Sequence, residues 1–319
     1  MNPKNILVIG GSGFVGSAIV SKLAALGNRV VVPTRRRERA KHLIILPTVD
    51  VVQADVRDDT VLAGLVAAKD VVINLVGILH GDNARPYGRR FAAAHVELPR
   101  RIAAACASAG VPRLLHMSAL GVGHDAPSMY LRSKAAGEDA VRDSVGGSAW
   151  TIFRPSVIFG REDRFINLFA LMQRFLPVMA VGGADARLQP VHVEDVASAF
   201  VNAIDTRATF GGVFELAGPK QYSLREIIAF AGRASGHPRP IIGLPAGLAR
   251  LQAWMMEFAP VALLSRDNID SLKVDSVSAT PFPTALGVTP VTLESVMADH
   301  LAGRTPRQRY MRLRDRAGR

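Results

Sequence analysis

Cysteine is almost absent from this chain of 319 residues. Its single thiol, Cys106, excludes an internal disulfide, and with it the class of small secreted domains that depend on disulfides. Because Cys106 lies in an alanine-rich helical stretch, we expect a small buried core residue. Long apolar runs are also missing: residues 244–264 come closest, but two prolines and two charged side chains interrupt them. We therefore expect a globular protein of a reducing compartment without a transmembrane helix.

Metal-binding patterns are equally scarce. His116 and His192 have no partner at the spacing that metal ligands need, so we expect both to be structural and predict no metal site.

Acidic residues are fewer than basic ones: the chain has 27 Asp and Glu and 39 Lys and Arg, which gives a net charge of +12. Residues 304–319 hold seven Arg and one Asp. This basic tail is solvated, or it binds an anionic membrane surface or an acidic protein partner. No nucleic-acid-binding motif accompanies the charge, so we expect no nucleic-acid partner.

Since the N-terminus enters a core strand within a few residues, we expect a cytoplasmic protein without a signal peptide. Attachment at the inner face of the membrane is an option that the tail leaves open.

A glycine-rich turn between a strand and a helix is the strongest signal in the chain. The apolar residues 6–9 lead into Gly10, Gly13 and Gly16, and a helical pattern follows. Gly10 permits the tight turn, Gly13 lets the backbone approach a pyrophosphate, and Gly16 lets the helix lie close to the strand. The open helix N-terminus offers N–H groups to the phosphates. The alternative is a tight structural turn without a ligand. The predicted cofactor-binding residues of this turn are Gly10, Ser12, Gly13, Phe14, Val15 and Gly16.

The end of the second expected strand indicates which cofactor binds. An NAD site usually carries Asp or Glu there, but this chain reads Thr34-Arg35-Arg36-Arg37. Guanidinium groups pair well with phosphate, so we predict that Arg35 and Arg36 favour NADP(H) over NAD(H). A solvated basic loop is the alternative.

Strand and helix patterns alternate through the first half of the chain, which predicts an α/β fold with a doubly wound parallel Rossmann sheet. Residues 1–160 form the NAD(P)-binding domain, completed by residues of about 188–204. Residues 161–187 and 205–303 form a smaller, mainly helical C-terminal lobe. Between Leu248 and Phe258 the apolar spacing predicts a helix whose stripe packs in the core of this lobe. A docking face for a partner is the second interpretation.

Tyr130 and Lys134 are the candidates for chemistry, because their spacing of four puts them on one face of a helix. A nearby ammonium favours phenolate, so we expect Lys134 to lower the pKa of Tyr130. Tyr130 then acts as general acid or base beside a nicotinamide, and Ser118, at a strand end, binds the same oxygen. Lys134 also serves as a candidate ligand of the nicotinamide ribose. The alternative is a surface pair without a catalytic role.

Together these motifs resemble the short-chain dehydrogenase/reductase superfamily, in its extended or atypical branch, over the whole chain. The resemblance implies that Asp55 and Val56 contact the adenine, and that the backbone from Pro155 to Val157 meets the nicotinamide side. Leu75, near the end of the expected strand 70–76, completes the cofactor-binding set. Extended relatives often carry Asn where this chain has His95, so we interpret His95 as a packing or polar substitution.

The runs 153–165, 190–197 and 265–268 allow a narrower match. They are similar to the family of the nucleotide-binding accessory subunit of respiratory complex I and its bacterial homologues, a related branch of which assists quinone synthesis. This resemblance implies an accessory or regulatory NADP(H)-binding protein whose partners are a membrane respiratory complex or quinone-pathway proteins. The alternative is an active NAD(P)-dependent reductase or epimerase with Tyr130 as acid/base on a small carbonyl or hydroxyl substrate.

Overall fold

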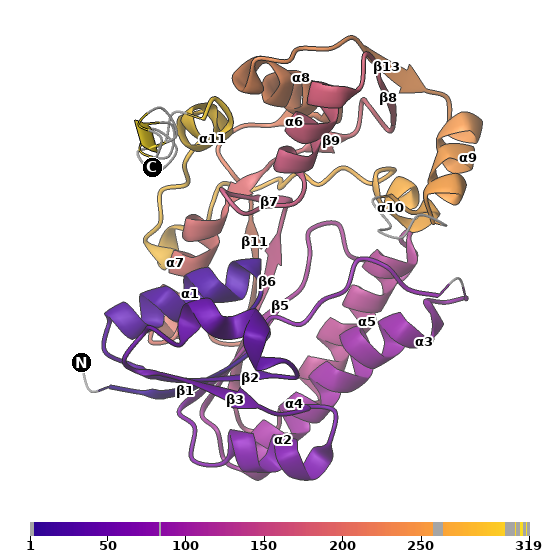
Figure 1. Ribbon diagram of the computed structural model, residues 1–319. Helices are drawn as coiled ribbons and strands as arrows, with labels where there is room; N and C mark the ends of the chain where they lie inside the picture. Colours follow the sequence, from indigo (N-terminus) through magenta and orange to yellow (C-terminus); the bar gives the residue numbers. More distant parts are fainter. Residues whose placement is uncertain are drawn as a thin grey trace.

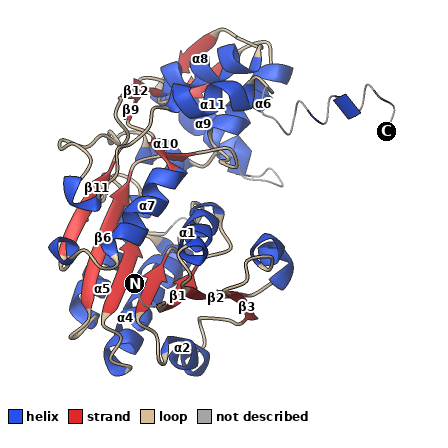
Figure 2. Ribbon diagram, turned by 90° about the vertical axis from the view of Figure 1, so that its left-hand side faces the viewer, coloured by secondary structure: helices blue, strands red, loops and turns tan. Residues whose placement is uncertain are grey.

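Seven parallel strands form the central sheet of the computed structural model (Figures 1 and 2), which describes residues 3–82, 84–257 and 264–303, with residues 310, 313, 314 and 317. The strand order is β11-β6-β5-β4-β1-β2-β3. Their bounds are β1 (Asn5–Ile9), β2 (Arg29–Thr34), β3 (Val49–Gln53), β4 (Val71–Asn74), β5 (Arg113–Met117), β6 (Ala149–Pro155) and β11 (Gly212–Leu216). The order reverses between β1 and β4, and ligands of doubly wound sheets bind at such a switch point.

Helices cover both faces of this sheet, which confirms the predicted fold class. Ile6 and Val8 of β1 share a core with α1 (Phe14–Ala25) and α7 (Val193–Ala203). Leu7 and Ile9 point to the opposite core, formed with α2 (Asp59–Val66), α4 (Leu98–Ser108) and α5 (Met129–Ser144). Because both faces are buried, the strands are apolar throughout instead of alternating.

Strand β11 comes from the stretch 205–303, which the sequence assigns entirely to the lobe. It pairs with β6 over five residues, from Gly212↔Thr151 to Leu216↔Pro155. As an edge strand it buries fully only Leu216, so its hydrophobic pattern is weak and the sequence gives little sign of it.

The helical stretch from residue 88 to residue 108 is divided into three segments. It consists of α3 (Gly88–Phe91), a π-helical turn η2 (Ala92–Glu97) and α4, with Pro99 in the first turn of α4. Cys106 is fully buried on α4, as expected, and burial raises its pKa to about 12.

The C-terminal lobe lies beyond the carboxyl ends of the strands (Figure 1). Three two-stranded ribbons, β7 with β10, β9 with β12 and β8 with β13, support α6, α8 and α11 around a separate apolar core. Its elements are β7 (Ile158–Phe159), α6 (Ile166–Phe175), β8 (Met179–Gly182), β9 (Arg187–Leu188), β10 (Val191–His192), β12 (Tyr222–Ser223), α8 (Leu224–Ser235), β13 (Ile241–Leu244), α9 (Ala246–Glu257), α10 (Arg266–Ser271) and α11 (Leu293–Leu301). The structure also contains the 3₁₀ segments η1 (Arg37–Leu43), η3 (Arg207–Thr209) and η4 (Thr284–Leu286).

The prediction that the stripe of α9 packs in the lobe core is wrong. Leu248, Leu251, Trp254 and Met255 are all about half exposed, at 53%, 49%, 45% and 56%. The buried face of α9 consists of Ala249 and Ala253, whose small side chains let the helix lie close to β8. Phe258, the last member of the stripe, lies outside the described residues, as does most of the basic tail.

Within the described part of the chain, no helix combines the length and apolar character needed to cross a membrane. In the same residues, no three His, Cys, Asp or Glu side chains lie together as a metal site.

Arg113 ties the sheet to α7 at the end away from the lobe. Its guanidinium is buried and donates to Thr151 Oγ1 at 2.7 Å, to the Ala203 carbonyl at 2.8 Å and to Thr209 Oγ1 at 3.0 Å. Burial in this apolar setting lowers the pKa of Arg113 to about 10. The Ala203 carbonyl also accepts from Thr209 Oγ1 at 3.2 Å, but the buried Thr151 and Thr209 hydroxyl oxygens take their hydrogen bonds from Arg113.

Replacing Arg113 by Met therefore leaves buried acceptors without partners, and we expect the free energy of unfolding to fall by about 2–3 kcal/mol. Urea denaturation measures this change. Arg29→Met, at an exposed position on β2, is the control and should stay close to the parent protein. Equal losses in the two variants would contradict the role given to Arg113.

Candidate nucleotide site

The glycine turn adopts the geometry that its sequence predicts. Gly10 has φ +88°, a left-handed conformation that favours glycine, and its carbonyl accepts the Gly13 N–H at 3.1 Å. A Cβ on Gly16 would lie 2.3 Å from the Gly10 oxygen, so only glycine allows α1 to begin this close to the turn. No side chain caps α1 at Gly13. The helix N-terminus therefore offers its N–H groups to an anion.

The residues in and around the turn differ in burial: some lie in the core, and others reach the surface. Val15 is buried in the core below α1, so it shapes the turn instead of lining its surface. Ser12 and Phe14 are partly exposed, and the Phe14 ring lies against Gly160 after β7. Leu75 follows β4, and its backbone packs against Gly10. One region at the carboxyl ends of the strands, beside the switch point, is thus bordered by residues 10–16, Leu75 and the segment after β6.

The basic side chains at the end of β2 are exposed, and an acidic residue, Asp55, follows the end of the neighbouring strand β3. Arg35 and Arg36 are both exposed, and Arg35 contributes to the low pKa of Asp55. Asp55 forms a two-pronged ion pair with Arg57, with Nε–Oδ1 at 3.0 Å and Nη2–Oδ2 at 2.6 Å. These hydrogen bonds hold the pKa of Asp55 at about 2. Val56, next in sequence, packs against the apolar core beside α2.

Ser118, Tyr130 and Lys134 come from β5 and α5. Ser118 directly follows β5, where its N–H donates to the Phe153 carbonyl at 2.7 Å, and its buried Oγ has no hydrogen-bond partner. Lys134 is also buried, and its Nζ donates to the Met117 carbonyl at 2.6 Å. Burial lowers the pKa of Lys134 to about 8. Lys134 thus binds the residue directly before Ser118.

The expected lowering of the Tyr130 pKa is not found. Burial raises the pKa of Tyr130 to about 12, and the Lys134 ammonium is directed to the Met117 carbonyl instead of the phenol. Spacing on the helix alone predicted the pair, but the carbonyl at the end of β5 competes for the ammonium. In this arrangement Tyr130 is a neutral phenol at physiological pH.

A histidine behind Tyr130 has the packing role expected for it. His95 Nε2 accepts the Ile78 N–H at 3.0 Å, so its Nδ1 carries the proton and donates to Ser133 Oγ at 2.8 Å. Ser133 Oγ in turn donates to the Tyr130 carbonyl at 2.8 Å. Burial lowers the pKa of His95 to about 2, so the ring stays neutral. It lies edge-on to the Tyr130 ring, with centroids 5.5 Å apart.

Asp267 is a contributor to the site that the sequence does not reveal. Its carboxylate lies at the N-terminus of α5, where Oδ1 accepts the Met129 N–H at 2.6 Å and Oδ2 accepts the Tyr130 N–H at 3.1 Å. Desolvation of this buried group raises its pKa. Asp267 belongs to α10, so the lobe holds the turn that carries Tyr130. The capping box from Ser265 to Asn268 is a local signal for α10, but nothing local indicates its contact with residues about 137 positions earlier.

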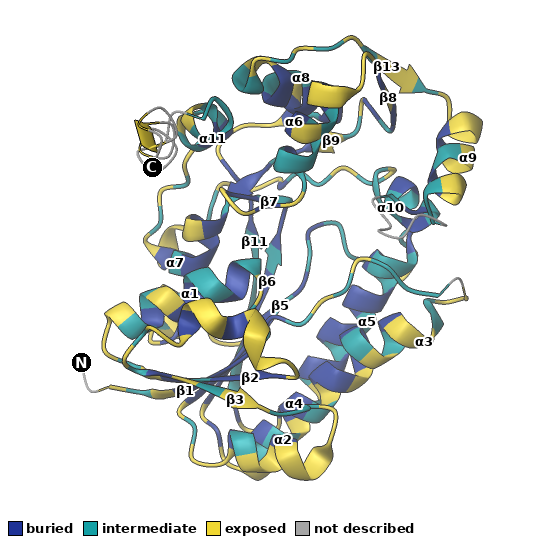
Figure 3. Cartoon of the chain, in the orientation of Figure 1, coloured by how far each residue is buried: buried dark blue, intermediate teal, exposed yellow. Residues whose placement is uncertain are grey.

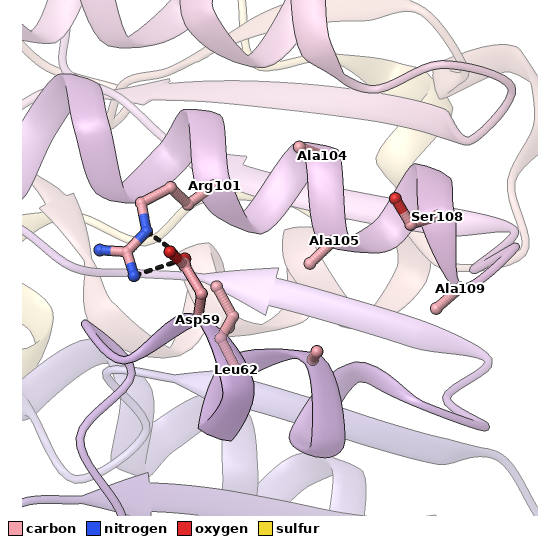
Figure 4. Close-up of a pocket in the computed structure, with 8 residues that line it drawn as sticks. Asp59, Leu62, Arg101, Ala104, Ala105, Ser108 and Ala109 are labelled. Atoms are coloured by element: carbon pink, nitrogen blue, oxygen red, sulfur yellow. Dashed lines mark hydrogen bonds and ion pairs between the residues drawn. The ribbon is translucent and has the colours of Figure 1, made fainter.

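The carboxyl end of β6 closes the site beside Ser118. The Pro155 carbonyl accepts the Leu120 N–H at 2.9 Å, and the Val157 carbonyl accepts the Val191 N–H at 3.0 Å. These bonds fix the backbone that the family resemblance assigns to the nicotinamide side. The open hollow of about 410 Å³ between α2 and α4 (Figure 4) lies elsewhere, and its polar pair, Asp59 and Arg101, is already joined by a hydrogen bond of 2.6 Å.

A model described as the NAD dependent epimerase/dehydratase family matches residues 6–217, from β1 through β11. The chain belongs to this family. The match covers the glycine turn, Ser118, Tyr130 and Lys134 together, so all of these residues lie within the region that the family shares.

Relatives extend the similarity into the lobe. The mouse mitochondrial protein NADH dehydrogenase (ubiquinone) 1 alpha subcomplex subunit 9 is 34% identical over 307 residues, which cover 90% of this chain and 77% of the mouse protein. The Arabidopsis thaliana protein of the same name is 32% identical over 291 residues, covering 85% and 70%. These relatives confirm the predicted resemblance to the complex I subunit family. A nucleoside-diphosphate-sugar epimerase from Staphylococcus aureus shares the fold, with a TM-score of 0.73, 17% identity and coverage of 93% and 99%.

Gly16→Ala tests the family's turn in this chain. The added Cβ meets backbone atoms of Gly10 and Gly11 at 2.3 and 2.6 Å, so α1 must shift, at about 1–3 kcal/mol for overpacking. We expect the dissociation constant for NADPH, measured by fluorescence titration, to rise by on the order of tenfold or more. Gly64→Ala in α2, where a Cβ has open space, is the control for a helical glycine. Unchanged NADPH binding in the Gly16 variant would refute the site.

Proposed function

We propose that this chain is an NADP(H)-binding accessory or regulatory component of a respiratory assembly of the complex I type or of a quinone-related assembly. The observation that carries the proposal is the similarity over 90% of the chain to a subunit of NADH dehydrogenase (ubiquinone), which includes the lobe as well as the nucleotide-binding domain. Similarity confined to residues 6–217 would have suggested only a shared nucleotide fold.

The chemistry of the site supports binding more than turnover. General acid–base catalysis is most efficient when the pKa of the group lies near the working pH, whereas burial raises the pKa of Tyr130 to about 12. Lys134, which would assist the phenol, donates to the Met117 carbonyl. The glycine turn, in contrast, has its anion-binding geometry fully formed. A bound dinucleotide then stabilises the folded state by mass action, which is a structural use of the cofactor.

Within this proposal, NADP(H) is preferred through Arg35 and Arg36. Strand β2 ends at Thr34 without a carboxylate that could hold a ribose 2′-hydroxyl, and both arginines are exposed beside it. Asp55, which follows β3, forms an ion pair with Arg57 at 2.6 Å, and this pair offsets the repulsion between its carboxylate and a 2′-phosphate.

Arg35→Asp should therefore weaken NADPH binding by on the order of tenfold more than NADH binding. The loss follows from removal of one cation and addition of an anion near the 2′-phosphate. Titration calorimetry with both nucleotides measures the difference. Arg39→Asp makes the same change of charge four positions on, in η1, and should affect the two nucleotides equally. An equal loss of both nucleotides in the Arg35 variant would exclude this contact.

Purification of the tagged protein from gently solubilised native membranes tests the proposed assembly. We expect subunits of complex I, or enzymes of quinone synthesis, at constant stoichiometry with the tagged chain, identified by mass spectrometry. The Gly16→Ala variant shows whether the nucleotide site is needed for this association. Recovery of the chain alone, from native amounts of protein, would contradict an accessory role.

A slow NADPH-dependent reductase is the second candidate, because the buried Ser118 Oγ lacks a partner and lies where a substrate oxygen would accept its hydrogen bond. Tyr130 would supply the proton, and Lys134 would hold the nicotinamide ribose. A chain recovered without partners, whose oxidation of NADPH with a carbonyl substrate disappears in Tyr130→Phe, would favour this candidate over the first.

A further inference from the structure

The outer side of α9 and the adjoining β13 form an apolar surface, called here the lobe face. It consists of Ile242, Leu248, Leu251, Trp254 and Met255, whose exposed fractions lie between 45% and 56%. Figure 3 shows exposed residues along the outer sides of α9 and β13. The helix buries two alanines and exposes its large residues, the reverse of the arrangement usual for a helix on a globular protein.

A second group of exposed apolar side chains lies directly before β8. Leu171, Phe175, Leu176 and Val178 are between 39% and 72% exposed. Strand β8 pairs with β13 along four residues, and Gln252 of α9 donates to the Ala180 carbonyl at 3.1 Å. The two groups therefore belong to one part of the lobe, on two segments joined by a strand pair. Large exposed apolar side chains gathered in one part of a protein mark a site of interaction.

The charge of these segments has one sign. Residues 171–184 and 227–256 contain no Asp or Glu, whereas they hold Arg174, Arg233, Arg239 and Arg250. Of these, Arg250 pairs with Asp270 of α10 at 3.4 Å, and Arg239 donates to the Gln173 carbonyl at 2.9 Å. The carboxylate that ends α9, Glu257, is paired with Arg266 at 3.0 Å. An anionic surface can therefore approach the lobe face without meeting an unpaired carboxylate of either segment.

We propose that the lobe face binds the surface of an anionic phospholipid bilayer, with α9 lying in the plane of the interface. Hydrocarbon accepts Leu, Ile and Met side chains without requiring hydrogen bonds, and the indole of Trp254 suits the headgroup level. The exposed arginines Arg174 and Arg233 can then reach the phosphate groups. A specific protein interface usually carries several direct hydrogen bonds. Arg250 and Gln252, two polar side chains of α9, are already paired with Asp270 and with the Ala180 carbonyl.

This contact is independent of the nucleotide site and of the proposed assembly. It also differs from attraction by the basic tail, because it requires insertion of apolar side chains. Binding by the tail alone disappears at high salt, whereas insertion persists.

Vesicle binding with an internal fluorescent reporter tests the proposal. The chain has two tryptophans, so Trp150→Phe leaves Trp254 as the only indole. Vesicles of phosphatidylcholine with phosphatidylglycerol should shift the Trp254 emission to shorter wavelength, and brominated lipid should quench it. Sedimentation with the vesicles should persist at high salt and in a chain that ends at Gly303.

The double variant Leu248→Asp/Leu251→Asp should reduce vesicle affinity by on the order of tenfold or more. Leu26→Asp/Ile45→Asp is the matched control, because these side chains are 64% and 81% exposed on the nucleotide-binding domain and the change of charge is the same. Equal losses in both double variants, or sedimentation without a change in Trp254 emission, would overturn the proposal. Absence of vesicle binding by the parent protein would also overturn it. If, in addition, the lobe-face variant loses a co-purifying protein, the lobe face binds a protein and not a bilayer. NADPH titration of each variant checks that the nucleotide site, and with it the fold, is intact.

Discussion

The close approach of Gly16 to the Gly10 carbonyl is the contact on which the rest of the nucleotide site depends. It sets the angle at which α1 leaves β1, and α1 packs with α7 in the core beneath. A displaced α1 would carry its N-terminus away from the switch point between β1 and β4, and the partial positive charge of the helix would no longer face a phosphate. One missing methyl group thus couples the packing of the first βα unit to the recognition of an anion.

Helix α5 joins this site to the lobe. On the side of the nucleotide-binding domain, Lys134 of α5 donates a hydrogen bond to the end of β5, and the main chain of Gly137 lies close to the His95 carbonyl. From the lobe, Asp267 bonds to the first N–H groups of the helix. The position of Tyr130 is consequently set by both parts of the molecule. A ligand that contacts α5 and the glycine turn would stabilise the lobe's attachment along with the nucleotide-binding domain.

Local signals in the sequence predicted those parts of the structure that local interactions determine. Apolar runs predicted strands of the central sheet such as β1 and β4, and the glycines predicted the turn between β1 and α1. Contacts between distant residues could not be predicted in this way. Strand β11 is positioned by its pairing with β6 and has only a weak hydrophobic pattern of its own. Asp267 is separated in sequence by about 137 residues from the N–H groups that it binds. The stripe on α9 was correctly periodic, but periodicity does not distinguish a face turned toward the core from one turned toward an external surface.

The presence of Tyr130 and Lys134 in the sequence suggests catalysis, yet the structure gives Lys134 another use. One helical turn beyond it, Glu138 is 1% exposed and accepts hydrogen bonds from Arg154 at 2.7 and 2.8 Å and from Arg142 at 2.9 Å. The charge of Glu138 favours the protonated form of Lys134 and partly offsets the effect of burial on its pKa. Lys134 therefore joins the end of β5 to a buried charge network that reaches β6. Lys134 thus has a structural contact besides the catalytic role that its spacing from Tyr130 suggests, so its presence alone does not distinguish binding of a cofactor from turnover.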